Sequence, residues 1–228
     1  SKMTTIKNIS YREIVRPLRL TFSTAQGSKN EMRNFIVTVT LDDGSVGRGE
    51  CASSLSLKNE SIPAVREFLA MVTLGLYGLP IREYEPFVAQ LRRRYPQNPM
   101  VISGVEVALF RAYLACTGRT EHEYWGGKTR SIETDITIPL TNDVEFIRRW
   151  LQYCFRKGFS VFKLKVGGDV ERDKKALFFV YNELSHNLDN FALRLDGNQG
   201  FTAKKYVQFT EVIRKAGYAI ELFEQPLP

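Results

Sequence analysis

The pattern of apolar and polar residues changes near residue 130. Before it, alternating β-rich stretches at 5–16 and 32–50 predict strands, and "DDGSVG" carries the Asp-Gly signal of a hairpin turn. The polar segment between these strands, 17–30, is predicted to be a flexible loop. Three stretches with helical spacing follow, at residues 61–76, 83–95 and 100–117. We therefore predict an α+β domain over residues 1–130.

After residue 130, strand-like and helix-like stretches alternate with a repeat of about 30 residues. The short apolar strands are predicted at 132–140, 159–167, 191–200 and 218–226, and the helices at 142–158, 169–185 and 202–217. This alternation predicts a parallel sheet of βα units. Because a (β/α)₈ barrel of TIM type has eight strands, residues 131–228 are predicted to be an incomplete (β/α) barrel, its first four strands. We expect a longer chain or another polypeptide to supply the rest.

Residues at the ends of the predicted helices support these boundaries. Asn142 or Thr141 is expected to cap the first barrel helix, and Asp169 the second. Gly158 and Gly217 are expected to end the first and third helices.

Polar residues recur where the predicted strands end: Lys163 and Lys165 on the second, Asp196 and Asn198 on the third, and Glu224 on the fourth. Side chains alternate across a strand, so the two lysines point to the same side. Asp196 follows Lys165 by 31 residues and precedes Glu224 by 28, which is one βα unit each. Since the carboxyl ends of the strands form the active site in parallel barrels, we expect these residues to converge.

These residue types suit the removal of a proton next to a carboxylate. Asp196 and Glu224 can hold one Mg²⁺, which prefers oxygen ligands and keeps positions open for water or substrate. The ion would polarise a substrate carboxylate and stabilise the enediolate formed by proton loss. A lysine beside a second ammonium, removed from water, is pushed towards the uncharged form that a base requires. One lysine is therefore predicted to be the base, while its neighbour contacts the substrate carboxylate.

Each of these residues also has a structural interpretation. Inward lysines often form ion pairs, and an Asp at a strand end often caps a helix. Thr137, on the first barrel strand, is explained equally well as an ordinary β-former or as a substrate contact. Asn198 can face the site as a substrate-binding residue, or it can support Asp196. The joint placement on three successive strands favours the functional interpretation.

The segments "KLKVGG", "LRLDGNQG" and "FEQP" together resemble the enolase superfamily, and within it the muconate-lactonizing-enzyme subgroup. "RPLRLTFSTAQG" and "FIVTVTLDDGSVGRGE" resemble the capping-domain hairpin of that family, with its specificity loop. "ISGVEVALFRAYLACTGRTEHEYWGG" resembles the helix that leads into the barrel. The resemblance covers nearly the whole chain. It implies an enolase-like fold, with an N-terminal α+β capping domain followed by the first half of a (β/α)₈ barrel.

The resemblance also implies a role for each matched residue. Lys165 corresponds to the acid/base and Lys163 to its partner, while Asp196 and Glu224 correspond to the first two Mg²⁺ ligands. Asn198 corresponds to the supporting residue after the first ligand. The family's third carboxylate ligand and its opposing lysine lie on the fifth and sixth strands, which are outside these 228 residues.

The function implied is a Mg²⁺-dependent epimerase or racemase that abstracts a proton α to a carboxylate, on a dipeptide or an N-acyl amino acid. "TDITIPL" and "PLRLTFSTAQG" resemble the dipeptide epimerases in particular. The alternatives are a β-elimination enzyme of o-succinylbenzoate-synthase or lactonizing type, and a non-catalytic truncated half-barrel.

Composition and charge limit the kinds of binding partner that we expect. The net charge is +7, but no clustered basic and aromatic stripe is present, so we expect a small carboxylate substrate and no nucleic acid. No apolar run approaches the roughly 18 residues of a membrane helix, so no membrane partner is expected. Three widely spaced cysteines are predicted to be buried free thiols in a reducing, cytoplasmic setting. A homo-oligomer, or a partner completing the barrel, is also expected.

Overall fold

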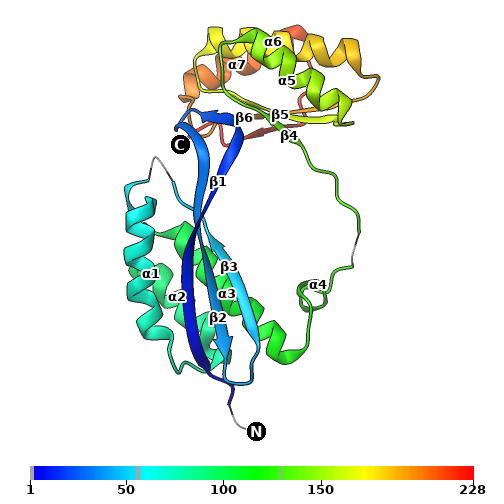
Figure 1. Ribbon diagram of the computed structural model, residues 1–228. Coiled ribbons are helices and arrows are strands. Elements are labelled where there is room, and N and C mark those ends of the chain that lie inside the picture. The colour runs from blue at the N-terminus through cyan, green and yellow to red at the C-terminus, as the bar shows by residue number, and fades with distance from the viewer. Residues whose placement is uncertain (1–2, 55–56, 129) are drawn as a thin grey trace. The chain divides into compact units, whose positions relative to one another are not determined.

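A computed structural model describes residues 3–54, 57–128 and 130–228 (Figure 1). Its contacts divide the chain into two compact units. Unit 1 comprises Ser1–Pro17 and Glu31–Ser131, and unit 2 comprises Leu18–Asn30 and Ile132–Pro228. The segment Leu18–Asn30 therefore belongs with the barrel-like part by its contacts, although it lies far from that part in the sequence. The predicted domain division after residue 130 stays a prediction.

The first sheet has the strand order β1 (Ile6–Thr24), β2 (Gly27–Leu41) and β3 (Val46–Cys51). Strands β2 and β3 pair antiparallel across the predicted Asp-Gly turn. The prediction of a loop at 17–30 is wrong, because β1 runs on to Thr24 and β2 starts at Gly27. Leu18, Leu20 and Phe22 continue the alternation of a strand, which the intervening polar residues conceal in the sequence.

The helical elements of unit 1 are η1 (Lys58–Glu60), α1 (Ile62–Leu76), η2 (Ile81–Glu83), α2 (Tyr84–Arg94), α3 (Pro99–Thr117) and α4 (Glu121–Tyr124). The three long ones match the predicted helices closely. Ser61 caps α1 by accepting a hydrogen bond from the Ala64 amide. Glu60 is fully buried and accepts bonds from the Met100 and Val101 amides, so it caps α3 from another element.

Helix α3 lies directly on strand β3. A Cβ at Gly49 would lie 1.9 Å from the Gly104 carbonyl oxygen, and one at Gly47 would lie 2.1 Å from the Ala108 carbonyl oxygen. Glycines are therefore required here, because the backbones of helix and strand touch.

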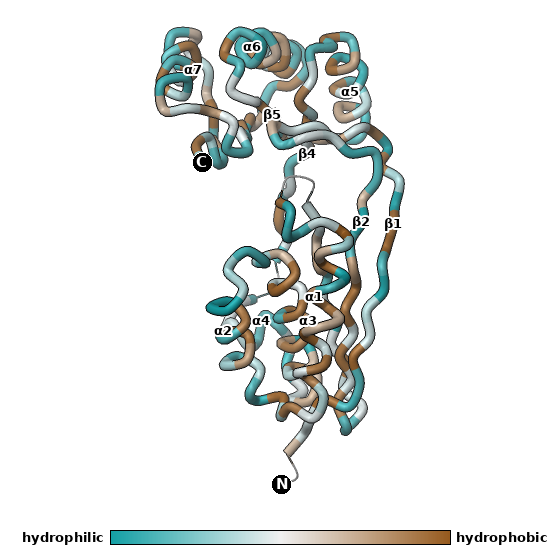
Figure 2. Tube along the Cα trace, turned by 90° about the vertical axis from the view of Figure 1, so that its left-hand side faces the viewer, coloured by the Kyte–Doolittle hydropathy of each residue, from teal (hydrophilic) through white to brown (hydrophobic). Residues whose placement is uncertain are grey.

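Helix α3 also corrects an expectation. By length and composition alone it could cross a membrane, although no such run was expected from the sequence. Eight of its residues are buried, and six of these belong to the core of unit 1. Figure 2 shows apolar residues along α1 and α3. That packing is typical of a core helix.

The second sheet is parallel, in the order β4 (Ile136–Ile138), β5 (Val161–Lys165), β6 (Ala192–Asp196) and β7 (Leu222–Glu224). The helices α5 (Val144–Arg156), α6 (Val170–Asn187) and α7 (Ala203–Ala216) cover one of its faces (Figure 1). Each predicted strand and helix is found, but the strands are shorter because their predicted ends form the connecting loops.

The helix ends of unit 2 correct one detail. Helix α5 is capped by Asp143, which accepts from the Phe146 amide, and not by Asn142 or Thr141. The Thr141 hydroxyl instead accepts a bond from the Asp143 amide, which orients the cap. Asp169 caps α6 as predicted.

Gly158 follows α5 with a positive φ, and Gly217 ends α7 in the left-handed conformation, both as expected.

The three cysteines are free. Cys51 and Cys154 are buried in the cores of unit 1 and unit 2 respectively. Cys116 is only partly buried, so the prediction of three buried thiols is wrong for that residue. The cytoplasmic setting stays a prediction.

Candidate active site

Three of the predicted site residues lie side by side at the carboxyl ends of neighbouring strands. Lys165 on β5 is in register with Asp196 on β6, and Asp196 is in register with Glu224 on β7. Of the residues just before them, Leu164 and Leu195 belong to the core beneath the helices, and Phe223 packs against it. By strand alternation, the lysine and the two carboxylates therefore point to the face of the sheet that the helices do not cover.

The charged atoms of this face are in contact. Lys165 Nζ lies 2.5 Å from Asp196 Oδ2 and 3.0 Å from Asn198 Oδ1. Lys163 Nζ lies 3.3 Å from Glu224 Oε2 and 3.9 Å from Asp196 Oδ2. Two ammonium groups and two carboxylates thus form one cluster with no net charge.

Burial within the cluster is uneven. The side chains of Lys165 and Asp196 are 7% and 2% exposed, whereas those of Lys163 and Glu224 are 21% and 41% exposed. The sequence predicted that the two lysines would share a face, and the structure places them there. The repulsion expected between them is offset by the carboxylates, because each ammonium has an acidic partner at contact distance.

The loop that carries Asn198 has unusual backbone geometry. Asn198 and Gln199 have φ values of 43° and 64°, and Gln225 after β7 has 38°. Non-glycine residues seldom have a positive φ, and the few that do are concentrated at functional sites. The Asn198 amide donates to Asp196 Oδ1 at 3.0 Å, so Asn198 supports Asp196 through its backbone and meets Lys165 through its side chain.

Thr137 lies on β4 in register with Lys163, which is two residues before Lys165 on the neighbouring strand. Its carbonyl oxygen accepts a hydrogen bond from Trp150 Nε1 at 2.9 Å, which ties β4 to α5. A role of Thr137 in substrate binding stays a prediction.

The tip of the β1–β2 hairpin, which belongs to unit 2, supplies contacts that the sequence did not indicate. The Phe22 ring centre lies 5.5 Å from Lys165 Nζ, within cation–π range. Gln26 Nε2 donates to the Asn198 carbonyl at 2.8 Å, and the Leu140 amide donates to the Ser23 carbonyl at 3.0 Å. The available signal was Phe22 itself, a large apolar residue within a polar segment.

Arg194, a charged residue near the cluster, was also not singled out from the sequence. It lies two residues before Asp196, on the same face of β6, and it pairs with Asp135 at 2.9 Å and Glu221 at 2.5 Å. These hydrogen bonds raise the pKa of Arg194 further, so it stays charged. Strand alternation alone would have placed it beneath the cluster.

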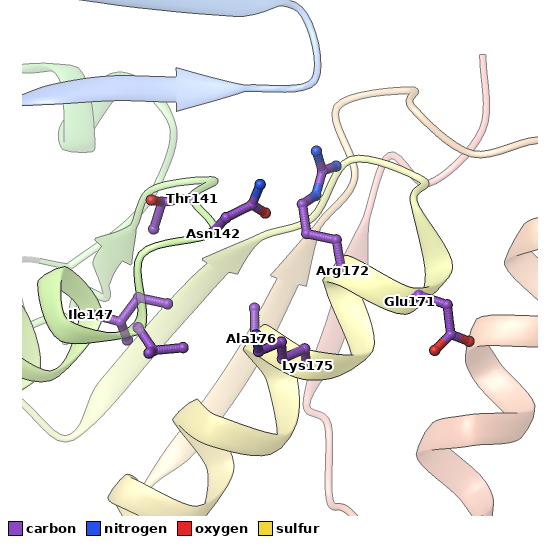
Figure 3. A pocket seen from close by; sticks show the side chains of 8 residues that line it. Thr141, Asn142, Ile147, Glu171, Arg172, Lys175 and Ala176 are labelled. Atoms are coloured by element: carbon purple, nitrogen blue, oxygen red, sulfur yellow. The ribbon is translucent and has the colours of Figure 1, made fainter.

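A pocket of about 510 Å³ opens between the first turns of α5 and α6. It is lined by residues that include Thr141, Asn142, Arg172 and Lys175, and Figure 3 shows that Glu171 points away from Thr141 and Asn142. It contains none of the predicted site residues, so the candidate chemistry lies in the charged cluster.

The carboxylates of the cluster could provide part of a metal site. Among the described residues, no group of three or more His, Cys, Asp and Glu side chains is placed to hold an ion. Asp196 and Glu224 nevertheless present two carboxylates in register on one face of the sheet. Both are within ion-pair distance of the Lys163 ammonium. Because Mg²⁺ is often bound through only one or two protein carboxylates, this pair fits a part of such a site.

The second unit is a half-barrel of TIM type. Its sheet is parallel, helices cover one face, and acids and bases lie at the carboxyl ends of the strands. No protein-family model matches the chain. Curated relatives do match. The L-Ala-D/L-Glu epimerases of Clostridium acetobutylicum and Bacillus subtilis are 27% and 28% identical over 97% of this chain, and 61% and 60% of those proteins are covered.

Solved structures agree with these relatives. A mandelate racemase/muconate lactonizing protein from Herpetosiphon aurantiacus superposes with a TM-score of 0.88 at 26% identity, covering 100% of this chain and 63% of its own. The L-Ala-D/L-Glu epimerase of B. subtilis, in a substrate-liganded complex, gives 0.88 at 26% identity, covering 98% and 62%.

These similarities confirm the predicted resemblance to the dipeptide-epimerase branch of the enolase superfamily, and they confirm the predicted fold class. The chain spans about 60% of the length of the curated relatives it matches.

Proposed function

We propose that this chain carries the first half of the active site of a Mg²⁺-dependent epimerase or racemase, which removes a proton α to a carboxylate. The observation that supports this most is the position of Lys165. It leaves β5 on the uncovered face, contacts Asp196 and Asn198, and lies at the level of Glu224.

Each residue of the cluster receives a role. Asp196 and Glu224 would hold the Mg²⁺, which when bound polarises the substrate carboxylate. Lys165 takes the α-proton on Nζ in its amine form, and Lys163 contacts the substrate carboxylate. Asn198 keeps Lys165 and Asp196 in place. Returning a proton to the opposite face of the carbon requires a second acid, which we expect from outside residues 1–228.

The substrate class is proposed from the relatives. They include an aromatic dipeptide epimerase of H. aurantiacus and an L-Lys-D/L-Arg epimerase of Methylococcus capsulatus. A dipeptide epimerase from M. capsulatus, 28% identical with a TM-score of 0.83, was crystallised with Mg and a dipeptide. These names support a dipeptide or an N-acyl amino acid as the substrate.

Two alternatives stay open. A muconate lactonizing enzyme from Pseudomonas fluorescens shares the fold, with a TM-score of 0.85 at 22% identity, and β-elimination could use Lys165 alone as its base. A non-catalytic half-barrel would keep the cluster only as an ion-pair network.

The deciding experiment measures proton exchange in D₂O with Mg²⁺, on a panel of dipeptides and N-acyl amino acids, for this chain and for the complete protein. We expect both epimers to gain deuterium at one α-carbon. Lys165→Ala should lower exchange by about 10³-fold, while calorimetry should show that Mg²⁺ still binds. Lys205→Ala, on the exposed side of α7, is the matched control.

Other outcomes point elsewhere. Unimpaired exchange in Lys165→Ala would exclude that residue as the base. An unsaturated or ring-closed product would favour β-elimination, and an absence of exchange in every form would favour the non-catalytic half-barrel.

A further inference from the structure

The turn that follows Lys165 is held by a buried acid. Asp173, in the first turn of α6, is 1% exposed. Both of its carboxylate oxygens accept from the Gly167 amide at 3.1 Å, and Oδ2 also accepts from the Gly168 amide at 2.8 Å. Arg172 Nε lies 3.6 Å away as a counter-charge. Asp173 therefore fixes the backbone two and three residues beyond Lys165.

Capping of α6 does not explain Asp173. Asp169 already caps this helix by accepting from the Arg172 amide at 3.2 Å. Asp173 lies inside the helix, and its carboxylate faces back to amides that precede it. Since a buried carboxylate costs free energy unless its oxygens are hydrogen-bonded, its place here depends on the glycine turn.

That turn is packed against the loop that carries Asn198. A Cβ at Gly168 would lie 2.1 Å from the Gly200 carbonyl oxygen, and one at Gly200 would lie 2.7 Å from the Gly167 carbonyl oxygen and 2.9 Å from Ala25 Cβ. Three segments thus lie in direct contact: the Gly167–Gly168 turn, the loop 197–201 and the hairpin tip 24–27. Gln26 joins the last two by its bond to the Asn198 carbonyl.

We propose that Asp173 is a positioning residue for the Lys165 site. By holding the Gly167–Gly168 turn, it sets the loop that presents Asn198 to Lys165, and through that loop the hairpin tip that places Phe22 beside Lys165. The proposal rests on the proposed function, because it concerns the same site. It assigns a role to a residue that touches neither the substrate nor a proposed metal ligand.

The first test is hydrogen–deuterium exchange of the backbone, which needs no activity. Asp173→Asn removes one acceptor oxygen and turns an amide donor towards the glycine amides. We expect exchange to quicken at least tenfold in residues 166–169 and also in 197–201 and 22–27. The amides of Gly197, Gln199 and Phe201 are hydrogen-bonded and serve as reporters. Asp169→Asn, which removes the same charge four residues away, should quicken exchange only in the first turn of α6.

Quickened exchange confined to 166–173 would overturn the proposal, since Asp173 would then act only locally. If Asp173→Asn does not fold, Asp173→Glu keeps the carboxylate but moves it by one methylene from the glycine amides, and it should also quicken exchange in 197–201. Unchanged exchange there would overturn the proposal.

The second readout is kinetic. In the complete protein, Asp173→Asn should lower kcat for α-proton exchange at least tenfold, with Mg²⁺ affinity unchanged, while Asp169→Asn stays within twofold. Equal kcat in the two variants would overturn the positioning role. Absence of exchange in the unaltered protein would instead count against the proposed function, and the hydrogen-exchange test would still decide the role of Asp173.

Discussion

The two sheets of this chain place charge differently. In unit 1, the buried polar residues of the described chain are Glu60 and Thr73, and the core around them is apolar. In unit 2, they are Lys165 and Asp196, at the carboxyl ends of β5 and β6, and Asp173, in the first turn of α6. Burying charge is costly unless it is paired and hydrogen-bonded. In unit 2, the buried charges of Lys165 and Asp196 lie in the proposed active site, whereas in unit 1 the buried acid, Glu60, caps helix α3.

Asp196→Ala should have the largest effect on stability, because it leaves the Lys165 ammonium buried without its closest partner. We expect unit 2 to lose about 4 kcal/mol of unfolding free energy, measured by urea denaturation with EDTA present. The double variant Lys165→Ala/Asp196→Ala should recover part of the loss, since no uncompensated ammonium remains. A double variant no more stable than Asp196→Ala would show that the pair does not interact.

Gly49→Ala should act on unit 1 alone. The added methyl would meet the backbone of α3, so we expect a loss of about 3 kcal/mol. Gly75→Ala is the control, because its Cβ would lie 3.7 Å from the nearest atom, an ordinary contact. Gly75 lies in the last turn of α1, so its replacement by alanine should change the unfolding free energy by less than about 0.5 kcal/mol. Equal stabilities of the two variants would contradict the close packing of α3 on β3.

Thiol labelling can assign each loss to a unit. Burial raises the pKa of Cys51 to about 12 and that of Cys154 to about 11, so both should resist iodoacetamide at pH 8 in the folded protein. Cys116, less buried, should react first. Gly49→Ala should speed labelling of Cys51, and Asp196→Ala that of Cys154. Parallel acceleration of both thiols in each variant would mean that the units open together.

Glu60→Gln should give the smallest effect, and one that depends on pH. Burial raises the pKa of Glu60 above 4.5, against the opposing effect of the Met100 and Val101 amides. The folded state therefore binds the proton more tightly. The stability that Glu60 contributes is full below pH 4.5 and is lost as the pH rises through its folded pKa.

The difference in unfolding free energy between the unaltered protein and Glu60→Gln should accordingly shrink with rising pH. It should shrink by about 1.4 kcal/mol for each factor of ten by which the folded state binds the Glu60 proton more tightly. Urea denaturation of both proteins from pH 4 to pH 8 measures it. A constant difference between them would show that Glu60 has an ordinary pKa.

The sequence allowed much of unit 2 to be predicted, because strand alternation and the βα repeat place Lys165, Asp196 and Glu224 together without any tertiary information. The sequence does not predict which carboxylate each lysine contacts, since that depends on side-chain conformations across three strands. The sequence predicts a loop at 17–30, where the structure has a hairpin, because the strand signal of Leu18, Leu20 and Phe22 is dispersed among polar residues. In the sequence, Asp173 resembles any charged residue on the solvated face of a helix. Only the structure shows that its carboxylate accepts hydrogen bonds from the Gly167 and Gly168 amides.

The hydrogen bonds after β6 have a consequence for biosynthesis. The amides of Gly197, Gln199 and Phe201 bond to the carbonyls of Glu224, Gln225 and Pro226. A ribosome therefore makes Asn198 well before the residues that hold its loop exist. Until Pro226 emerges, the left-handed backbone at Asn198 and Gln199 lacks these partners, so the half-site should become ordered in a late, single step of translation.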